Sequence, residues 1–141
     1  MDISRGFHIE QPDILIPWGI SEAELEKLFD GLDLRRVTNG YFVTHCDSLS
    51  GLSHELGFHF DLRAGSILRE LEFFGGNFTD NSSSFQTFQQ HLEATFGQPT
   101  TTLPGTEGFP SYTWLLDGCE IVHYVRKRFG PEELVRIKRK L

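Results

Sequence analysis

Short runs of alternating apolar and polar residues recur along the chain, and this period of two is typical of β-strands that bury one face. The clearest run is ELGFHFD at residues 55–61, where Leu56, Phe58 and Phe60 share one face of the predicted strand. Similar runs mark the other predicted strands. In all, six segments are predicted as strands: residues 40–46, 55–61, 67–74, 112–116, 119–129 and 134–140.

Two further segments place apolar residues three and four positions apart, which is the spacing of an amphipathic helix. The first begins at a capping box formed by Ser21 and Glu24, in which each side chain can bind the other residue's backbone N–H. The second begins at a similar box, Ser83 with Gln86, and ends at Gly97. The apolar stripes of the two predicted helices are Leu25, Leu28, Phe29 and Leu32, and Phe85, Phe88, Leu92 and Phe96.

An Asp-Gly dipeptide at 117–118 lies between two β-rich runs and predicts a β-hairpin with a type I′ turn. A turn at this position determines which residues lie opposite each other on the two strands. Tyr112 is then opposite His123, and Trp114 is opposite Ile121. These side chains share one face of the predicted sheet.

The predicted elements follow the same order twice, with one helix and then three strands in each half of the chain. The halves cover residues 17–75 and 83–140, and a loop rich in Gly, Asn and Ser at residues 75–84 joins them. Strands joined by short hairpins pair in an antiparallel manner. We therefore predict one α+β domain, in which two helix-strand-strand-strand units form one antiparallel sheet of about six strands with helices on one face.

Charge is distributed unevenly along the 141 residues, which carry a net charge of −7. The first 125 residues contain 18 acidic and 6 basic residues, and the remaining segment contains two acidic and seven basic residues. Because nucleic-acid binding requires a basic face, the acidic body argues against a nucleic-acid partner and fits either a soluble protein or one with a basic protein partner. The basic C-terminal segment is typical of an edge strand exposed to solvent.

The N-terminal residues contain no apolar core of a signal peptide, and no segment approaches the roughly 20 apolar residues that span a bilayer. We therefore expect a cytoplasmic protein that binds no membrane. The two cysteines, Cys46 and Cys119, are expected to be buried free thiols.

The candidate binding residues lie on the polar faces of two neighbouring predicted strands: His59, Asp61, Glu70 and Glu72. Cross-strand polar pairs of this kind are common on solvated sheets, and the same residue types also suit a metal or acid–base site. The sequence contains no H-E-x-x-H, C-x-x-C, phosphate-binding Gly-rich loop or G-x-S-x-G motif. We therefore predict no catalytic residue, no metal and no cofactor.

The aromatic residues Tyr112 and Trp114 form a second candidate group, together with His123 on the neighbouring strand. Such clusters usually belong to the core. If the helices cover the opposite face, Tyr112 and Trp114 become exposed anchors for a protein partner, because these residue types carry much of the binding energy of interfaces.

The order PWGIS-x-x-E, three strands, FQQHLEATFGQPT and then W…C-x-I-V resembles small bacterial proteins that repeat a helix-plus-antiparallel-strand unit. The β-lactamase-inhibitor-protein fold and the related outer-membrane assembly lipoprotein domain are built in this way. Some immunity proteins of bacterial toxin systems are also acidic α+β domains of this size. The chain lacks the lipoprotein signal with its cysteine and the paired disulfides of the secreted inhibitor, so no residue role is carried over.

Three hypotheses follow from these observations. The first is a non-enzymatic protein-binding module, such as an immunity-like inhibitor, that binds a basic partner through an acidic sheet face. The second is a small metal-binding or hydrolytic domain that uses His59 with the three carboxylates. The third is a self-associating structural domain, which leaves monomer and homodimer both open.

Overall fold

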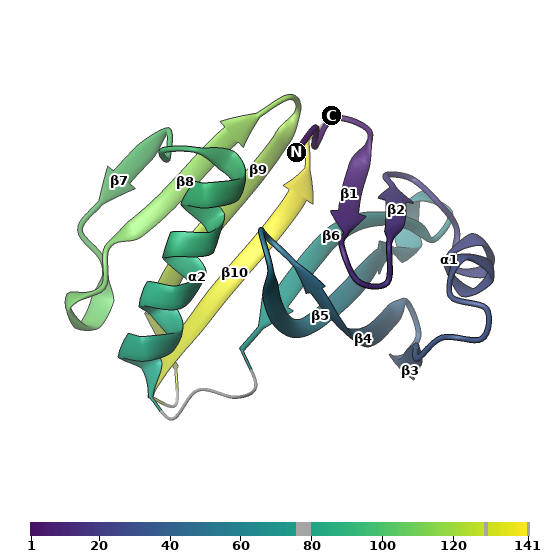
Figure 1. The fold of residues 1–141 in the computed structure, drawn as a ribbon, viewed down its shortest axis with the longest axis horizontal. Coiled ribbons are helices and arrows are strands. Elements are labelled where there is room, and N and C mark those ends of the chain that lie inside the picture. The colour runs from purple at the N-terminus through teal and green to yellow at the C-terminus, as the bar shows by residue number, and fades with distance from the viewer. Residues whose placement is uncertain (76–79, 129, 141) are drawn as a thin grey trace.

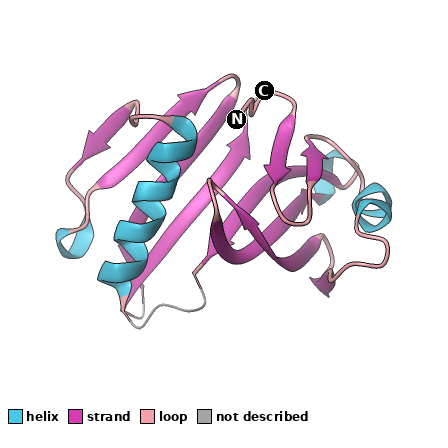
Figure 2. Cartoon of the chain, in the orientation of Figure 1, coloured by secondary structure: helices cyan, strands magenta, loops and turns pink. Residues whose placement is uncertain are grey.

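A computed structural model describes residues 1–75, 80–128 and 130–140 of the chain. It shows an α+β fold with two α-helices, a large antiparallel sheet and a small second sheet (Figures 1 and 2). The large sheet contains β3 (Arg35–Thr38), β4 (Tyr41–Ser48), β5 (Leu52–Asp61), β6 (Ile67–Phe74), β7 (Thr101–Leu103), β8 (Ser111–Leu116), β9 (Cys119–Lys127) and β10 (Pro131–Arg139).

The strands of the large sheet run in the order β3-β4-β5-β6-β10-β9-β8-β7, and every neighbouring pair is antiparallel. The first half of the chain supplies β3–β6 and the second half supplies β7–β10, so the halves meet where β6 pairs with β10. The joint predicted at 75–84 includes residues 76–79, which lie outside the described residues.

The prediction of about six strands is wrong, because the sheet has eight. The two additional strands, β3 and β7, lie at its edges, and every residue in them is exposed. A strand with no buried face has no alternation of apolar and polar residues, so the sequence carries no signal for it. The basic C-terminal strand was also predicted wrongly, since β10 lies at the centre of the sheet and not at its edge.

A second sheet, β1 (Gly6–Ile9) with β2 (Ile14–Pro17), also escapes the sequence prediction. Its side chains Phe7, Ile9 and Ile16 are fully buried. The Phe7 ring packs edge-on against Phe73 of β6, with 5.3 Å between the ring centroids. The hairpin therefore covers part of the large sheet, and the helices share that face with it (Figure 1).

The two α-helices begin at side-chain caps. α1 (Glu22–Leu28) has the predicted capping box, in which Glu24 N donates to Ser21 Oγ and Ser21 N donates to Glu24 Oε1, both at 3.1 Å. α2 (Asn81–Phe96) begins earlier than predicted, because Asp80 is its cap and accepts from Ser83 N at 2.7 Å. A carboxylate at this position also complements the positive end of the helix dipole.

Aromatic contacts place both helical segments on the same face of the large sheet. Phe29, directly after α1, packs edge-on against Phe58 of β5 at 5.8 Å. Phe85 of α2 stacks on His123 of β9, with 3.9 Å between the ring centroids.

Neither helix is long and apolar enough to cross a membrane, within the described part of the chain. Two single-turn 3₁₀ helices complete the fold, η1 (Leu62–Ala64) and η2 (Thr106–Gly108).

The β8–β9 hairpin has the predicted register. Tyr112 is opposite His123, and Trp114 is opposite Ile121, with the turn at 117–118. Both cysteines are free and buried, as expected.

Candidate functional site

Three of the four predicted polar residues come together on the sheet face opposite α2. His59 Nε2 lies 2.9 Å from Glu72 Oε1. Arg136 of β10 reaches both glutamates, with its guanidinium 3.5 Å from Glu72 Oε2 and 3.8 Å from Glu70 Oε1. We call His59, Glu70, Glu72 and Arg136 the outer charged network. The network joins β5, β6 and β10, and so links the two halves of the chain.

Asp61 does not belong to this network. Its Oδ1 accepts from the backbone N–H of Arg63 at 3.0 Å and caps the short helix η1. Its Oδ2 lies 3.8 Å from Nε of Arg69. A β-bulge in the β5–β6 pairing between His59 and Phe60 shifts the register directly before this position. Asp61 therefore has a local structural role at the strand end.

The surroundings of Glu72 keep it ionised. Burial raises the pKa of this carboxyl, but the hydrogen bond with His59 and the charge of Arg136 outweigh burial, so the pKa lies below its ordinary value. The Tyr41 ring stacks on His59, with 4.4 Å between ring centroids. Burial, and then the negative charge of Glu72, raise the pKa of Tyr41. His59 is thus contacted both by the ring of Tyr41 and by the carboxylate of Glu72.

Basic residues from β9 and β10 pair with the carboxylates of this face, so the face is not acidic as predicted. Lys138 lies directly opposite Glu70 in the β6–β10 pairing. Further ion pairs join Lys140 to Glu120 at 3.5 Å and Arg126 to Glu132 at 3.3 Å. The prediction missed this pairing because it placed the basic C-terminal strand at the edge of the sheet, away from β6.

The described residues contain no group of three or more His, Cys, Asp or Glu side chains arranged to hold a metal ion. His59 and the carboxylates named in the metal hypothesis all belong to that described part, and a basic side chain lies beside each carboxylate. A bound cation would have to compete with Arg136 and Arg69 for these oxygens.

Burial raises the pKa of the Cys46 thiol to about 12, which keeps this cysteine protonated and a poor nucleophile.

The two predicted aromatic anchors occupy different environments. Trp114 is 0% exposed, and its Nε1 donates to the carbonyl oxygen of Gly97 at 2.9 Å, so it belongs to the core and is unavailable to a partner. The prediction of Trp114 as a binding residue is therefore corrected, because the helices cover the face that carries it. Tyr112 on the same face is only partly buried and lines a surface groove.

A buried polar cluster lies beneath that groove, and sequence reasoning identified only one of its members. His123 Nε2 lies 2.6 Å from Glu133 Oε2, and its Nδ1 lies 2.9 Å from Gln89 Oε1. Ser84 Oγ donates to the second carboxylate oxygen of Glu133. Burial lowers the pKa of His123, against the opposing hydrogen bond and charge of Glu133. Gln89 and Glu133 gave no sequence signal, because isolated polar residues also occur on solvated faces.

The groove runs between α2 and the segment that connects η2 to β8. Its volume is about 600 Å³. Its walls combine aromatic rings with amide side chains, and the described residues of these walls include no lysine, arginine or histidine. The lining residues are Ser82, Phe85, Gln86, Gln89, Gln90, Glu93, Gly108, Phe109, Pro110 and Tyr112.

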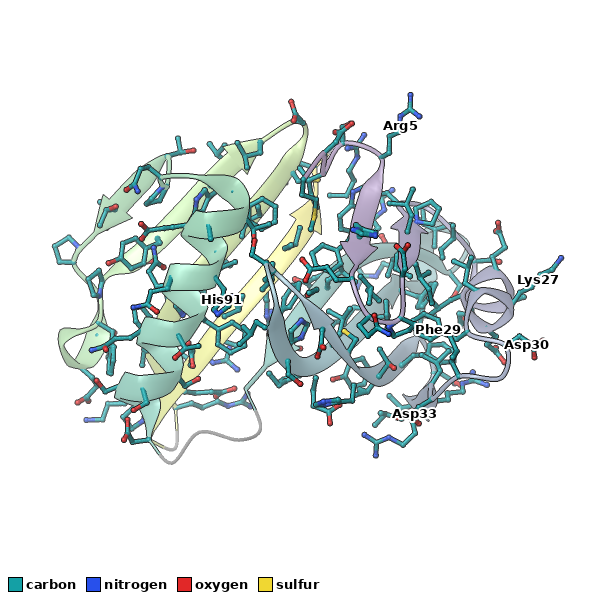
Figure 3. The ribbon with its side chains drawn as sticks, in the orientation of Figure 1. Arg5, Lys27, Phe29, Asp30, Asp33 and His91 are labelled. Atoms are coloured by element: carbon teal, nitrogen blue, oxygen red, sulfur yellow. The ribbon has the colours of Figure 1, made fainter. Side chains whose placement is uncertain are left out.

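Helix α1 and the loop that follows it lie at one end of the molecule (Figure 1). We call residues 22–34 the acidic end, because they include five acidic residues and one basic residue. In Figure 3, Lys27, Asp30 and Asp33 project from the outer side of α1 and the loop that follows it. Beside α1 lies a hollow of about 470 Å³. Most of its lining surface is apolar. The lining residues are Pro17, Ile20, Glu24, Lys27 and Leu28.

No protein-family model and no curated protein matches the chain. Among solved structures, the chain is similar to the crystal structure of a DUF4309 family protein (YjgB) from Bacillus subtilis. The two chains are 14% identical, and the match covers 85% of this chain and 78% of that protein, with a TM-score of 0.48. The resemblance to inhibitor and immunity proteins stays a prediction.

Proposed function

We propose that the protein is a non-enzymatic binding module for a basic protein partner, and that the partner binds at the acidic end formed by residues 22–34. An immunity-like inhibitor would act in this way. The observation that carries the proposal is the combination of unpaired negative charge and exposed leucines around α1.

The charge at the acidic end is available to a partner. Glu26, Asp30 and Asp33 form no ion pair with any residue that the structure describes. Glu26 and Asp30 lie four positions apart and are both exposed. Unpaired carboxylates attract a basic surface and increase the rate at which it associates. The acidic end therefore has the charge that a basic partner requires.

The same end exposes apolar side chains. Leu28 of α1 is 39% exposed and borders the hollow beside Pro17. Leu15 lies two residues before Pro17 on β2, where alternate residues point the same way, and it is 47% exposed. Leu32 follows α1 and is 46% exposed. Apolar residues surrounded by charged ones match the usual arrangement of protein interfaces.

The outer charged network supports this location over the sheet face first considered. Glu70 and Glu72 already pair with Arg136, and a partner would have to displace that guanidinium before it could use either carboxylate. Breaking an established ion pair costs free energy that binding must recover. The acidic end requires no such exchange.

The test is to capture partners with the purified protein from a lysate of the native host, and then to measure the affinity of the purified partner for two matched variants. One variant combines Glu26→Lys with Asp30→Lys at the acidic end. The control combines Glu120→Lys with Glu132→Lys on the sheet face, which changes the net charge by the same amount.

We expect the acidic-end variant to bind roughly 30-fold more weakly, with a smaller salt dependence, and the control to bind within about threefold of wild type. Equal affinity for wild type and the acidic-end variant would overturn this location. If only the control variant lost affinity, the partner would bind at the sheet face and not at the acidic end. Recovery of the bait alone, with a dimer in light scattering, would favour the predicted self-association instead.

A further inference from the structure

The groove along α2 has the dimensions and the rigidity of a small-molecule site. Its volume of about 600 Å³ lies within the usual range for ligand pockets, roughly 300–1,000 Å³. One wall is a single stripe of α2, in which Ser82, Gln86 and Gln90 recur every four residues, together with Glu93. The facing wall is the segment that ends at Tyr112.

Aromatic rings form the apolar part of the groove. The ring of Phe85 packs against those of Phe109 and Tyr112, with 4.9 Å and 6.1 Å between the ring centroids. Behind Phe85 lies the His123 ring, stacked at 3.9 Å, and His123 is itself held by Glu133. Each ring is thus held in place by others, which lowers the entropy cost of presenting an aromatic surface to a ligand.

Amide groups form the polar part, and two of them are free. Gln86 and Gln90 are exposed and make no side-chain hydrogen bond to any described residue. Gln89 between them is buried and engaged on both sides, since its Nε2 donates to Glu93 Oε2 at 2.6 Å and its Oε1 faces His123. The buried amide holds the wall, while the exposed amides can donate to a ligand and accept from it.

The electrostatics of the lining exclude anionic ligands. Among the lining residues that the structure describes, Glu93 is the one charged residue and none is basic. A phosphate or carboxylate in the groove would lose its hydration without gaining a cationic partner, and it would be repelled by Glu93. A neutral ligand with both an apolar face and hydroxyl groups meets neither penalty.

We propose that this groove binds a neutral saccharide. The C–H face of a sugar ring packs on the aromatic rings, and its hydroxyl groups pair with amide oxygen, amide nitrogen and carboxylate oxygen. A proline-rich peptide would also pack on the rings. Its prolines accept hydrogen bonds from the amide nitrogens but have no N–H to donate to the amide oxygens of Gln86 and Gln90, whereas sugar hydroxyl groups both donate and accept, so these amides favour a saccharide.

Saturation-transfer NMR and titration with maltose, cellobiose and N,N′-diacetylchitobiose test the proposal. The test variant combines Gln86→Ala with Gln90→Ala, both exposed positions that leave the buried cluster intact. The matched control is Gln11→Ala, an exposed glutamine outside the groove. Melting temperatures of both variants should match wild type and so show that they are folded.

We expect at least one disaccharide to receive saturation and to bind the test variant about tenfold more weakly, with the control within twofold of wild type. No binding of any of the three at 50 mM would overturn the proposal, as would equal binding to the test variant. Binding of decaproline without any saccharide would also overturn it. The acidic-end variant should bind the disaccharide normally, so this test is independent of the proposed protein partner.

Discussion

Two histidine–glutamate pairs bridge neighbouring strands in equivalent parts of the two halves, yet they occupy opposite environments. His59 on β5 lies 2.9 Å from Glu72 on β6, and His123 on β9 lies 2.6 Å from Glu133 on β10. Both contacts are diagonal, since each glutamate lies two residues from the position directly opposite its histidine. The His59 side chain is 35% exposed and that of His123 is 0% exposed.

The difference shows that the face of the sheet, and not the pair itself, determines what a histidine–glutamate contact does. On the outer face, Arg136 shares Glu72 and completes a charged network beside solvent. On the helix-covered face, Phe85 stacks on His123 and excludes water. Burial makes a pair indispensable to stability, because an unpaired buried group has no water to replace its partner.

The largest expected effect comes from breaking the buried pair. Glu133→Ala should lower the free energy of unfolding by about 3 kcal/mol, because it leaves Ser84 and His123 without their shared acceptor. The matched control Glu132→Ala removes the half-exposed neighbour that pairs with Arg126, and should cost about 0.5 kcal/mol or less. Urea denaturation measures both. A loss below about 1 kcal/mol for Glu133→Ala would contradict the comparison.

Reversing the charge in the outer pair should have a smaller but clear effect. Glu72→Lys sets a cation beside Arg136 and His59, and we expect a loss of about 2 kcal/mol in the free energy of unfolding. The control Glu26→Lys on α1 breaks no described ion pair and should change stability by less than about 0.5 kcal/mol. Equal melting temperatures for the two variants would show that the outer network does not hold the halves together.

The contributions of the two pairs to the free energy of unfolding should also be lost in different pH ranges. Burial lowers the folded-state pKa of His123 from its ordinary value of 6.5, so the unfolded protein binds more protons below that pH. Its share of the free energy of unfolding therefore decreases as pH falls below about 6.5. His54, also buried, has a pKa lowered in the same direction and adds to this decrease. Glu72 has a folded pKa below 4.5, so its share is lost only at lower pH.

Two-dimensional NMR of the histidine rings measures the first of these ranges directly. We expect the ring of His123 to titrate below pH 6.5 in the folded protein. Urea denaturation at pH 7 and pH 5.5 should then show lower stability at the lower pH. A titration midpoint of His123 at or above 6.5 would mean that the charge of Glu133 outweighs burial, and the contrast between the two pairs would disappear.

The smallest effect is expected from the histidine of the outer pair. His59→Gln keeps a polar side chain next to Glu72 at a partly exposed position, and should cost about 0.5 kcal/mol. His45→Gln, on β4 with a 52% exposed histidine, is the matched control and should cost no more. Chemical denaturation compares the two. If His59→Gln lowered the free energy of unfolding by more than about 2 kcal/mol, the outer pair would contribute as much to stability as the buried pair.

Local patterns predicted much of the secondary structure. The capping box of Ser21 and Glu24 and the turn at 117–118 depend on residues close together in the chain, so the sequence contains the whole signal. The start of α2 was misjudged because Asp80 and Ser83 are both good caps, and only the folded chain shows which one accepts the hydrogen bond. The edge strands had no periodic signal at all.

The sequence by itself determined the α+β class, the alternating faces of the strands and the excess of negative charge, because these depend on composition and on neighbouring residues. Only the tertiary structure decided that β10 lies beside β6, which brings Arg136 to Glu72 and neutralises the face predicted to be acidic. It also decided which face the helices cover, and so buried Trp114 while leaving Tyr112 in a groove. The order of the strands and the face that the helices cover depend on contacts between residues distant in sequence, and local periodicity carries no information about such contacts.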